Sequence, residues 1–203
     1  MNHKSRQISE LFEDALEKLG DENFIIDIPV CLTKKFLSYC AMFEDLGLVL
    51  EYIELLEKAT LSNTIKSSLT YSIICLYGKC FTKADNGYSK LESKYLFKSE
   101  NLITHENLMI LRNKFIAHRS DSDSEYGIAY LAINKDTQVS DVNFKLLKKN
   151  KFNAIELERV RDLTIFLRKK LEEKKIKSGQ KARKTFISKY DFEQMQEYLL
   201  NKD

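Results

Sequence analysis

Apolar side chains recur every three or four residues through most of the chain, which is the spacing of one face of an α-helix. The first such stretch covers residues 8–19. A short extended linker over residues 24–30 follows, around the single proline, Pro29. The next stretch, residues 33–56, predicts either one helix or two helices separated at Gly47, because glycine weakens a helix interior.

Further helices are predicted in the second half of the chain. Ser62 has the short hydroxyl side chain typical of a helix N-cap, and the apolar periodicity continues from it to residue 81. The same periodicity predicts a helix over residues 104–118 and a long helix over residues 155–171. A short terminal helix is predicted within residues 191–200.

The pattern between the 104–118 and 155–171 helices is that of strands. Residues 127–133 are β-branched and apolar, residues 134–136 are turn-like, and residues 139–144 can form a returning strand. We therefore expect a β-hairpin at about 127–144, inserted between helices.

Composition supports a mostly all-α fold. The chain has one proline and six glycines, which are too few for the many tight turns of an all-β protein. Its 203 residues are enough for one domain. No apolar run reaches the roughly 18 residues of a membrane span, and the N-terminus lacks the apolar region of a secretory signal. We expect a cytoplasmic protein that does not associate with membranes.

The four cysteines are expected to be buried, reduced thiols. Each lies among apolar neighbours, and no pair has the close spacing of a structural zinc site. We therefore expect neither a metal nor a cofactor. The cysteines are Cys31, Cys40, Cys75 and Cys80.

Positive charge is concentrated between residues 145 and 184. This stretch has about 15 Lys and Arg against about 5 Asp and Glu, whereas the rest of the chain is net negative. Such a stretch can bind the phosphates of a nucleic acid, and Lys148, Lys149 and Lys151 are the candidate contacts. The alternative is an ordinary solvated helix surface, whose lysines favour the helix dipole and solubility.

The chemically distinctive segment is residues 111–118, which contains Arg112, Asn113 and His118. Arginine is a permanent planar cation suited to phosphate, and histidine exchanges protons near neutral pH. Together they provide the minimum for metal-free RNA cleavage: His118 activates the 2′-hydroxyl and Arg112 stabilises charge on phosphorus. On an α-helix the two side chains are about 120° apart, so a ligand or a second copy of the helix can meet both.

A structural interpretation of the same residues is a histidine at the edge of the core beside a solvated arginine. His105, near the start of this helix, is expected to be a surface residue. Lys114 and Arg119 beside the motif are either phosphate contacts or ordinary surface cations.

The string Leu-Arg-Asn-Lys-x-x-Ala-His at residues 111–118 resembles the HEPN superfamily (higher eukaryotes and prokaryotes nucleotide-binding domains). The hallmark of that superfamily is an arginine, commonly followed by a polar residue, and a histidine after four to six intervening residues. Arg112, Asn113 and His118 match it, and Ala117-His118-x-x-Asp121 resembles the branch found in abortive-infection proteins. The preceding helix, residues 67–81, resembles the partner helix of that fold.

The length predicts a single domain, residues 1–203. The resemblance covers only the middle of the chain and implies a bundle of about four core helices there. The HEPN-like core would cover residues 51–178 and include the hairpin. Residues 1–50 would be a helical extension, and residues 179–203 a basic tail with a short helix. The resemblance also implies a homodimer joined through the motif helices, with two Arg-His pairs facing one cleft.

The implied function is a metal-independent endoribonuclease, a toxin or phage-defence (abortive infection) effector. Its implied partners are RNA, a second copy of the chain, and an antitoxin or another defence component. Two alternatives remain open: a non-catalytic RNA- or nucleotide-binding module of the same fold, and a helical scaffold for dimerisation. Toxins silenced by a nucleotidyltransferase antitoxin carry tyrosine two positions after the histidine, where this chain has Ser120, so that mode of silencing is not expected.

Overall fold

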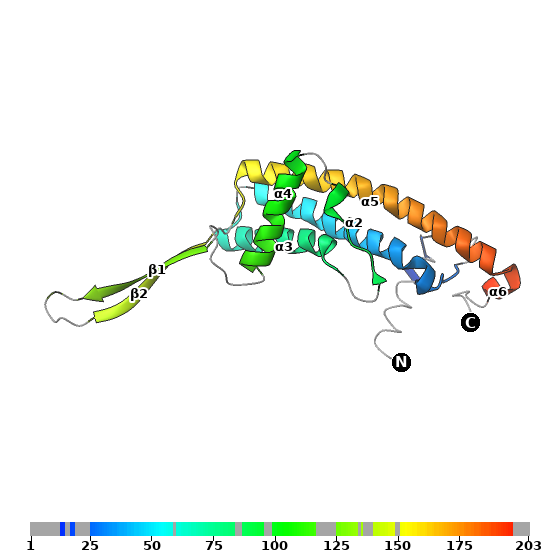
Figure 1. Ribbon diagram of the computed structural model, residues 1–203, viewed down its shortest axis with the longest axis horizontal. Coiled ribbons are helices and arrows are strands. Elements are labelled where there is room, and N and C mark those ends of the chain that lie inside the picture. The colour runs from blue at the N-terminus through cyan, green and yellow to red at the C-terminus, as the bar shows by residue number, and fades with distance from the viewer. Residues whose placement is uncertain are drawn as a thin grey trace. The chain divides into compact units, whose positions relative to one another are not determined.

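The computed structural model describes residues 13–14, 17–18, 25–58, 60–83, 87–95, 99–116, 125–133, 135, 140–148 and 151–196 (Figure 1). This part of the chain is mostly helical, which confirms the coarse expectation of a mostly α-helical fold. The α-helices are α2 (Val30–Glu57), α3 (Asn63–Phe81), α4 (Ser99–Ile110), α5 (Ala154–Lys189) and α6 (Phe192–Gln196). Most of the helix predicted at 8–19 lies outside the described residues.

The chain divides into two compact units. One consists of residues 1–37 and 175–203, and the other of residues 38–174. Helices α2 and α5 each contribute residues to both units. The division into a 1–50 extension, a 51–178 core and a 179–203 tail stays a prediction.

Helix α2 is continuous through Gly47, so of the two alternatives, one helix or two, the structure has the single helix. Leu46 and Val49, on either side of the glycine, are both completely buried. A glycine inside a helix costs only about 1 kcal/mol relative to alanine, less than burying two large apolar side chains contributes. Packing therefore outweighs the local preference of the glycine.

Helix α3 begins and ends where the sequence predicts. The N–H of Ile65 donates to Oγ of Ser62 at 3.3 Å, which confirms Ser62 as the N-cap. At the other end the N–H of Thr82 donates to the carbonyl of Lys79 at 3.2 Å, and its hydroxyl donates to the carbonyl of Gly78 at 2.9 Å. These bonds satisfy backbone groups that a helix end leaves without an intrahelical partner.

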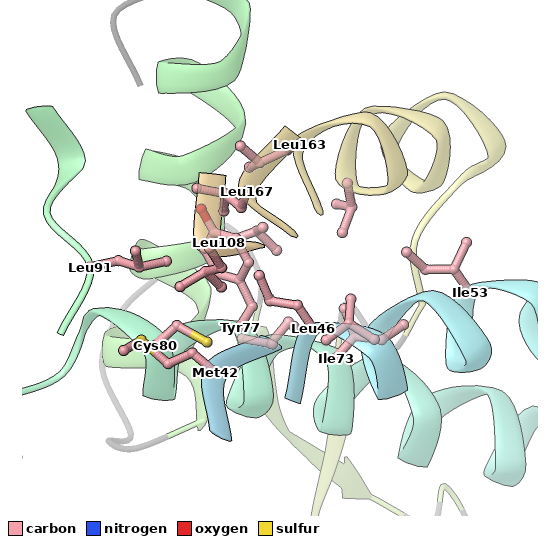
Figure 2. Close-up of a cluster of buried hydrophobic side chains, with 14 of the residues drawn as sticks. Met42, Leu46, Ile53, Ile73, Tyr77, Cys80, Leu91, Leu108, Leu163 and Leu167 are labelled. Atoms are coloured by element: carbon pink, nitrogen blue, oxygen red, sulfur yellow. The ribbon is translucent and has the colours of Figure 1, made fainter. Parts of the chain in front are cut away.

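The core of the 38–174 unit lies where α2, α3, α4 and the first part of α5 meet (Figure 2). A short segment after α3 closes one side of it: Leu91 is buried, and its N–H donates to the carbonyl of Cys80 at 2.8 Å. The largest completely or almost completely buried side chains of this unit are Leu46, Ile53, Ile73, Ile74, Tyr77, Leu108, Leu163, Leu167 and Leu171.

The predicted β-hairpin is present and is longer than expected. Strand β1 (Glu125–Ile133) pairs with β2 (Ser140–Lys148) in antiparallel register, with Leu131 opposite Val142 and Ala129 opposite Phe144. Two strands make up the sheet in the described part of the chain. Val142 and Phe144 are 78% and 77% exposed, so these apolar side chains add nothing to the helical core.

Helix α5 extends 18 residues beyond the predicted end at Leu171. It begins with a reciprocal cap, in which the N–H of Asn153 donates to the Glu156 carboxylate and the N–H of Glu156 donates to Oδ1 of Asn153, both at 2.9 Å. Ala182 and Phe186 are buried on the extension. The extension has only two buried apolar residues among many charges, which is why apolar periodicity failed to find it.

Two of the four cysteines contradict the expectation of burial. Cys31 and Cys75 are exposed, Cys40 is partly buried and Cys80 is buried. Cys75 has apolar sequence neighbours but lies on the side of α3 away from the buried Ile74 and Tyr77. Burial raises the pKa of the Cys80 thiol to about 12, which keeps it protonated at neutral pH.

None of the helices in the described part of the chain combines the length and apolar character required to cross a bilayer.

Gly47 gives a direct test of the packing in α2. A Cβ added there would meet only Arg168 guanidinium atoms among its nearest neighbours, at 3.7 and 3.8 Å, which is ordinary van der Waals contact. Gly47→Ala should raise the free energy of unfolding by about 0.5–1 kcal/mol, because alanine favours the helix. Urea denaturation measures this change.

The matched control is Gly87→Ala. Gly87 has φ +79°, a conformation that alanine adopts only with strain, so the same substitution should lower stability. A loss of stability from Gly47→Ala would contradict the packing of α2 described here.

Candidate functional site

The motif segment begins on a π-helical turn rather than on an α-helix. Helix α4 ends at Ile110 and continues as the π-helical turn η3, Leu111–Ile116. The predicted 104–118 α-helix is therefore wrong over 111–116, and it starts earlier, at Ser99. The 120° angle expected between Arg112 and His118 assumes an α-helix over the whole segment, and it stays a prediction because His118 lies outside the described residues.

His118 and Arg119 lie outside the described residues, so the structure places Arg112 and Asn113 but not their predicted partner. Single π turns occur frequently at functional sites. The geometry described here is therefore that of the arginine half of the motif.

The stem of Arg112 lies directly on the backbone of α3. A Cβ built at Gly78 would be 2.7 Å from Cγ of Arg112, 3.3 Å from its Cδ and 3.4 Å from its Cβ. Real side chains do not approach to 2.7 Å, so only glycine at position 78 leaves room for this arginine. A glycine inside a helix lowers stability by about 0.5–1 kcal/mol relative to alanine. Here the glycine lies at the position where the arginine stem requires the space.

The guanidinium of Arg112 is oriented by its sequence neighbour. Nη1 of Arg112 donates to Oδ1 of Asn113 at 2.8 Å. This bond uses one of the five N–H groups of the guanidinium, a planar group suited to phosphate. Asn113 is exposed, so the pair lies at the surface end of a partly buried arginine. The amide oxygen of Asn113 therefore orients the guanidinium of Arg112.

A buried hydrogen bond joins α3 and α4 beside this contact. Oη of Tyr77, which is completely buried, lies 2.8 Å from Nδ1 of His105. The ring of Phe81 packs on the histidine, with the two ring centroids 4.4 Å apart. His105 is 7% exposed, so its expected place on the surface is wrong. Burial lowers the pKa of His105 and raises that of Tyr77, which favours the neutral form of both groups.

Three residues at helical spacing form the side of α4 and η3 that faces α3. His105 bonds to Tyr77, Leu108 is buried in the core, and Arg112 packs on Gly78. These contacts place His105 and Arg112 on the side facing α3, and Leu108 follows His105 by three residues within α4. Arg112 is thus the end of a packed seam between the two helices, rather than a solvated side chain on the flank.

The predicted lysine contacts are described only in part. Lys151 is exposed just before α5, and Lys148 is the last residue of β2, with its side chain outside the description. Lys149 lies outside the described residues, and of Lys114 the structure describes the backbone in η3 alone.

The basic 145–184 stretch is divided between the two units at residues 174 and 175. In the 175–203 part, Lys177, Lys181 and Lys184 are exposed and follow one another by four and three residues, which places them on one face of α5. A row of cations at this spacing suits a phosphate backbone.

Some cations of the stretch are bound to carboxylates. Nη2 of Arg161 lies 2.6 Å from Oε2 of Glu57, and this bond lowers the pKa of the Glu57 carboxyl. Nζ of Lys170 lies 3.2 Å from Oε2 of Glu173. These pairs match the alternative of an ordinary solvated helix surface for part of the stretch.

Among the residues that the structure describes, no three His, Cys, Asp or Glu side chains come together in a group able to hold a metal ion.

Sequence reasoning missed Gly78 and Tyr77. The signal for Gly78 is its place inside the predicted 62–81 helix, in a chain with only six glycines. The signal for the Tyr77 contact is His105, which precedes Arg112 by seven residues and therefore lies on the same face of a helix. The sequence contains both signals, but neither of them identifies the helix that each residue contacts.

Comparisons of the chain with protein-family models, with curated proteins and with solved structures gave no match. The HEPN resemblance therefore stays a prediction carried by the motif residues.

The burial of His105 predicts a pH dependence of stability. Because the folded-state pKa of His105 is below the value of about 6.5 in an unfolded chain, the unfolded state binds more protons as pH falls through that range. The free energy of unfolding should therefore decrease below about pH 6.5, with a contribution from this group of at most about 1.4 kcal/mol per pH unit.

Urea denaturation of wild type and His105→Gln at several pH values between 7.5 and 5 measures that contribution. The variant should be less stable at pH 7.5, and its stability should change less with pH. Parallel pH profiles for the two proteins would show that His105 does not titrate with folding.

Proposed function

We propose that this chain is a HEPN-like, metal-independent endoribonuclease that works as a homodimer in a toxin or phage-defence system of the cytoplasm. The observation that carries the proposal is the placement of Arg112. Its stem is held against Gly78 of α3 and its guanidinium is bonded to Asn113, within the motif string that resembles the superfamily. The mostly helical 38–174 unit is compatible with the expected bundle.

In the proposed reaction His118 removes the proton of an RNA 2′-hydroxyl. The resulting oxygen attacks the neighbouring phosphorus, and the 5′-oxygen of the next nucleotide leaves and takes up a proton. The products are a 2′,3′-cyclic phosphate and a 5′-hydroxyl. Arg112 stabilises the charge that builds on the phosphoryl oxygens, and a cation held in place before the reaction does so with little reorganisation.

Exposed cations outside the motif fit a supporting role in RNA binding. Lys151 precedes α5, and Lys177, Lys181 and Lys184 line one face of it. We assign them to affinity through phosphate contacts, without a role in the chemical step. Lys114, Lys148, Lys149 and Arg119 belong to the same proposed set.

A non-catalytic RNA- or nucleotide-binding module is the second candidate. The bond between Arg112 and Asn113 supports it equally, because a positioned guanidinium binds phosphate without any base. The two candidate functions differ in whether His118 transfers a proton during a reaction.

Substitutions in the motif test the chemistry. His118→Ala should lower RNA cleavage by about 10²- to 10⁴-fold, the typical contribution of a general acid or base. Arg112→Ala should do the same, Arg112→Lys should rescue it only partly because lysine lacks the planar fork, and Asn113→Ala should be milder. Cleavage of a labelled RNA in the presence of EDTA measures these effects.

Arg159→Ala on the exposed side of α5 is the matched control and should keep full activity. Cleavage that EDTA abolishes and magnesium restores would exclude the metal-independent mechanism. A wild-type protein that binds RNA without cutting it would leave the binding module as the function.

The homodimer predicts a contact surface on α4. Ile103 and Ile110 are 55% and 48% exposed and seven residues apart, so they lie on one face of the helix that leads into the motif. An exposed apolar pair of this kind suits an isologous helix–helix contact. Sedimentation should show a dimer at tens of micromolar, and Ile103→Glu with Ile110→Glu should convert it to a monomer.

Ile165→Glu on α5 is the matched control, since Ile165 is 51% exposed and should leave the dimer intact. A wild-type monomer at the same concentration would overturn the predicted homodimer.

A further inference from the structure

We infer that Gly78 is a positioning residue for Arg112: the missing side chain at position 78 admits the arginine stem onto α3 and thereby fixes where the guanidinium lies. The catalytic consequence of this inference rests on the proposed ribonuclease function. The packing contact does not, and it can be measured without any activity.

The steric evidence is specific to the first carbons of the arginine. The atoms nearest a Cβ at position 78 are Cγ, Cδ and Cβ of Arg112, the closest at 2.7 Å. A collision with the tip of a flexible side chain is relieved by rotation of that tip. A collision with Cγ is relieved only by moving the whole side chain, and with it the guanidinium.

The other two glycines in the helices that the structure describes differ in this respect. At Gly47 an added Cβ would meet the tip of Arg168 at 3.7 Å, and at Gly179 it would meet the ring of Phe36 at 3.2 Å. Both neighbours are far from the motif in the sequence. Gly78 alone of these three lies against a motif residue, and against its stem.

The surroundings leave Arg112 little freedom to withdraw. Tyr77, next to Gly78, is bonded to His105 at 2.8 Å, and the completely buried Tyr77 ring fixes the distance between α3 and α4. Leu108 is buried on the same face of α4, one turn before Arg112. The helices cannot separate to admit a methyl group at position 78 without disturbing these contacts, so the arginine side chain would have to move.

A stability cycle tests the contact. Gly78→Ala in the wild-type chain should lower the melting temperature, because the methyl group collides with Cγ. In an Arg112→Ala background Cγ and Cδ are gone, and Cβ of the new residue remains at about the 3.4 Å of ordinary contact. There Gly78→Ala should raise the melting temperature, because alanine favours the helix.

An Arg112→Lys background keeps Cγ and Cδ, so Gly78→Ala should lower the melting temperature again. Gly47→Ala is the matched control glycine and should raise the melting temperature equally in all three backgrounds. Should Gly78→Ala alone fail to fold, recovery of folding by Arg112→Ala is the expected rescue.

RNA kinetics test the catalytic consequence. Gly78→Ala should lower kcat by about 10- to 100-fold, as expected when a catalytic group is displaced by about 1 Å. KM and the affinity for a non-cleavable 2′-O-methyl RNA should change by less than about two-fold, because most phosphate contacts are elsewhere. Gly47→Ala should retain wild-type kcat.

The outcomes separate the inference from the proposed function. The same change in melting temperature from Gly78→Ala in every background would overturn the contact, whatever the activity. Opposite signs in the arginine and alanine backgrounds together with undiminished kcat would overturn the positioning role. A wild-type chain that does not cut RNA would overturn the proposed function and the catalytic consequence together, whereas the stability cycle would still decide the contact.

Discussion

The close approach of α3 and α4 is the constraint on which the site depends. Two adjacent residues of α3 define it: Tyr77 bonds to the buried His105, and Gly78 receives the stem of Arg112. The first is a directional bond in a dry environment, where losing one partner leaves a buried polar group unsatisfied. The second is a steric condition: because Gly78 has no side chain, the stem of Arg112 can occupy that space. Together they fix the position along α3, and the distance from that helix, at which Arg112 leaves the core.

The segment from α4 through η3 is held in place at several successive residues. The core of the 38–174 unit anchors α4 through Leu108, and the π turn η3 follows immediately. The guanidinium is then oriented at the surface by Asn113. A cation that must stabilise charge in a transition state benefits from such support, because the cost of orienting it is met during folding.

The elements that sequence reasoning found are those whose evidence is local. The Ser62 cap, the end of α3 at Phe81 and the paired strands of the hairpin each follow from residue type and spacing within a few positions. What sequence reasoning left open or misjudged depends on tertiary contacts. Gly47 does not break α2 because its neighbours are buried, and His105 is inside because Tyr77 of another helix lies opposite it.

The candidate site shows the same limit. Residue chemistry selected Arg112 and Asn113, and the structure describes them hydrogen-bonded to each other. The π turn and the contact of Arg112 with Gly78 depend on how two helices meet. The periodicity of a single segment holds no information about that meeting. A glycine inside an otherwise apolar helix face was the visible sign that another chain segment passes close by.

The hairpin separates two properties of the protein that are usually linked. Leu131, Val142 and Phe144 expose more than half of their surface and lie outside the helical core. Exposed apolar strand surface favours association with other strands and lowers colloidal stability, whereas resistance to unfolding comes from the buried apolar side chains of α2 to α5. The apolar surface of the strands thus bears on association and the buried core on resistance to unfolding, so these two properties depend here on different residues.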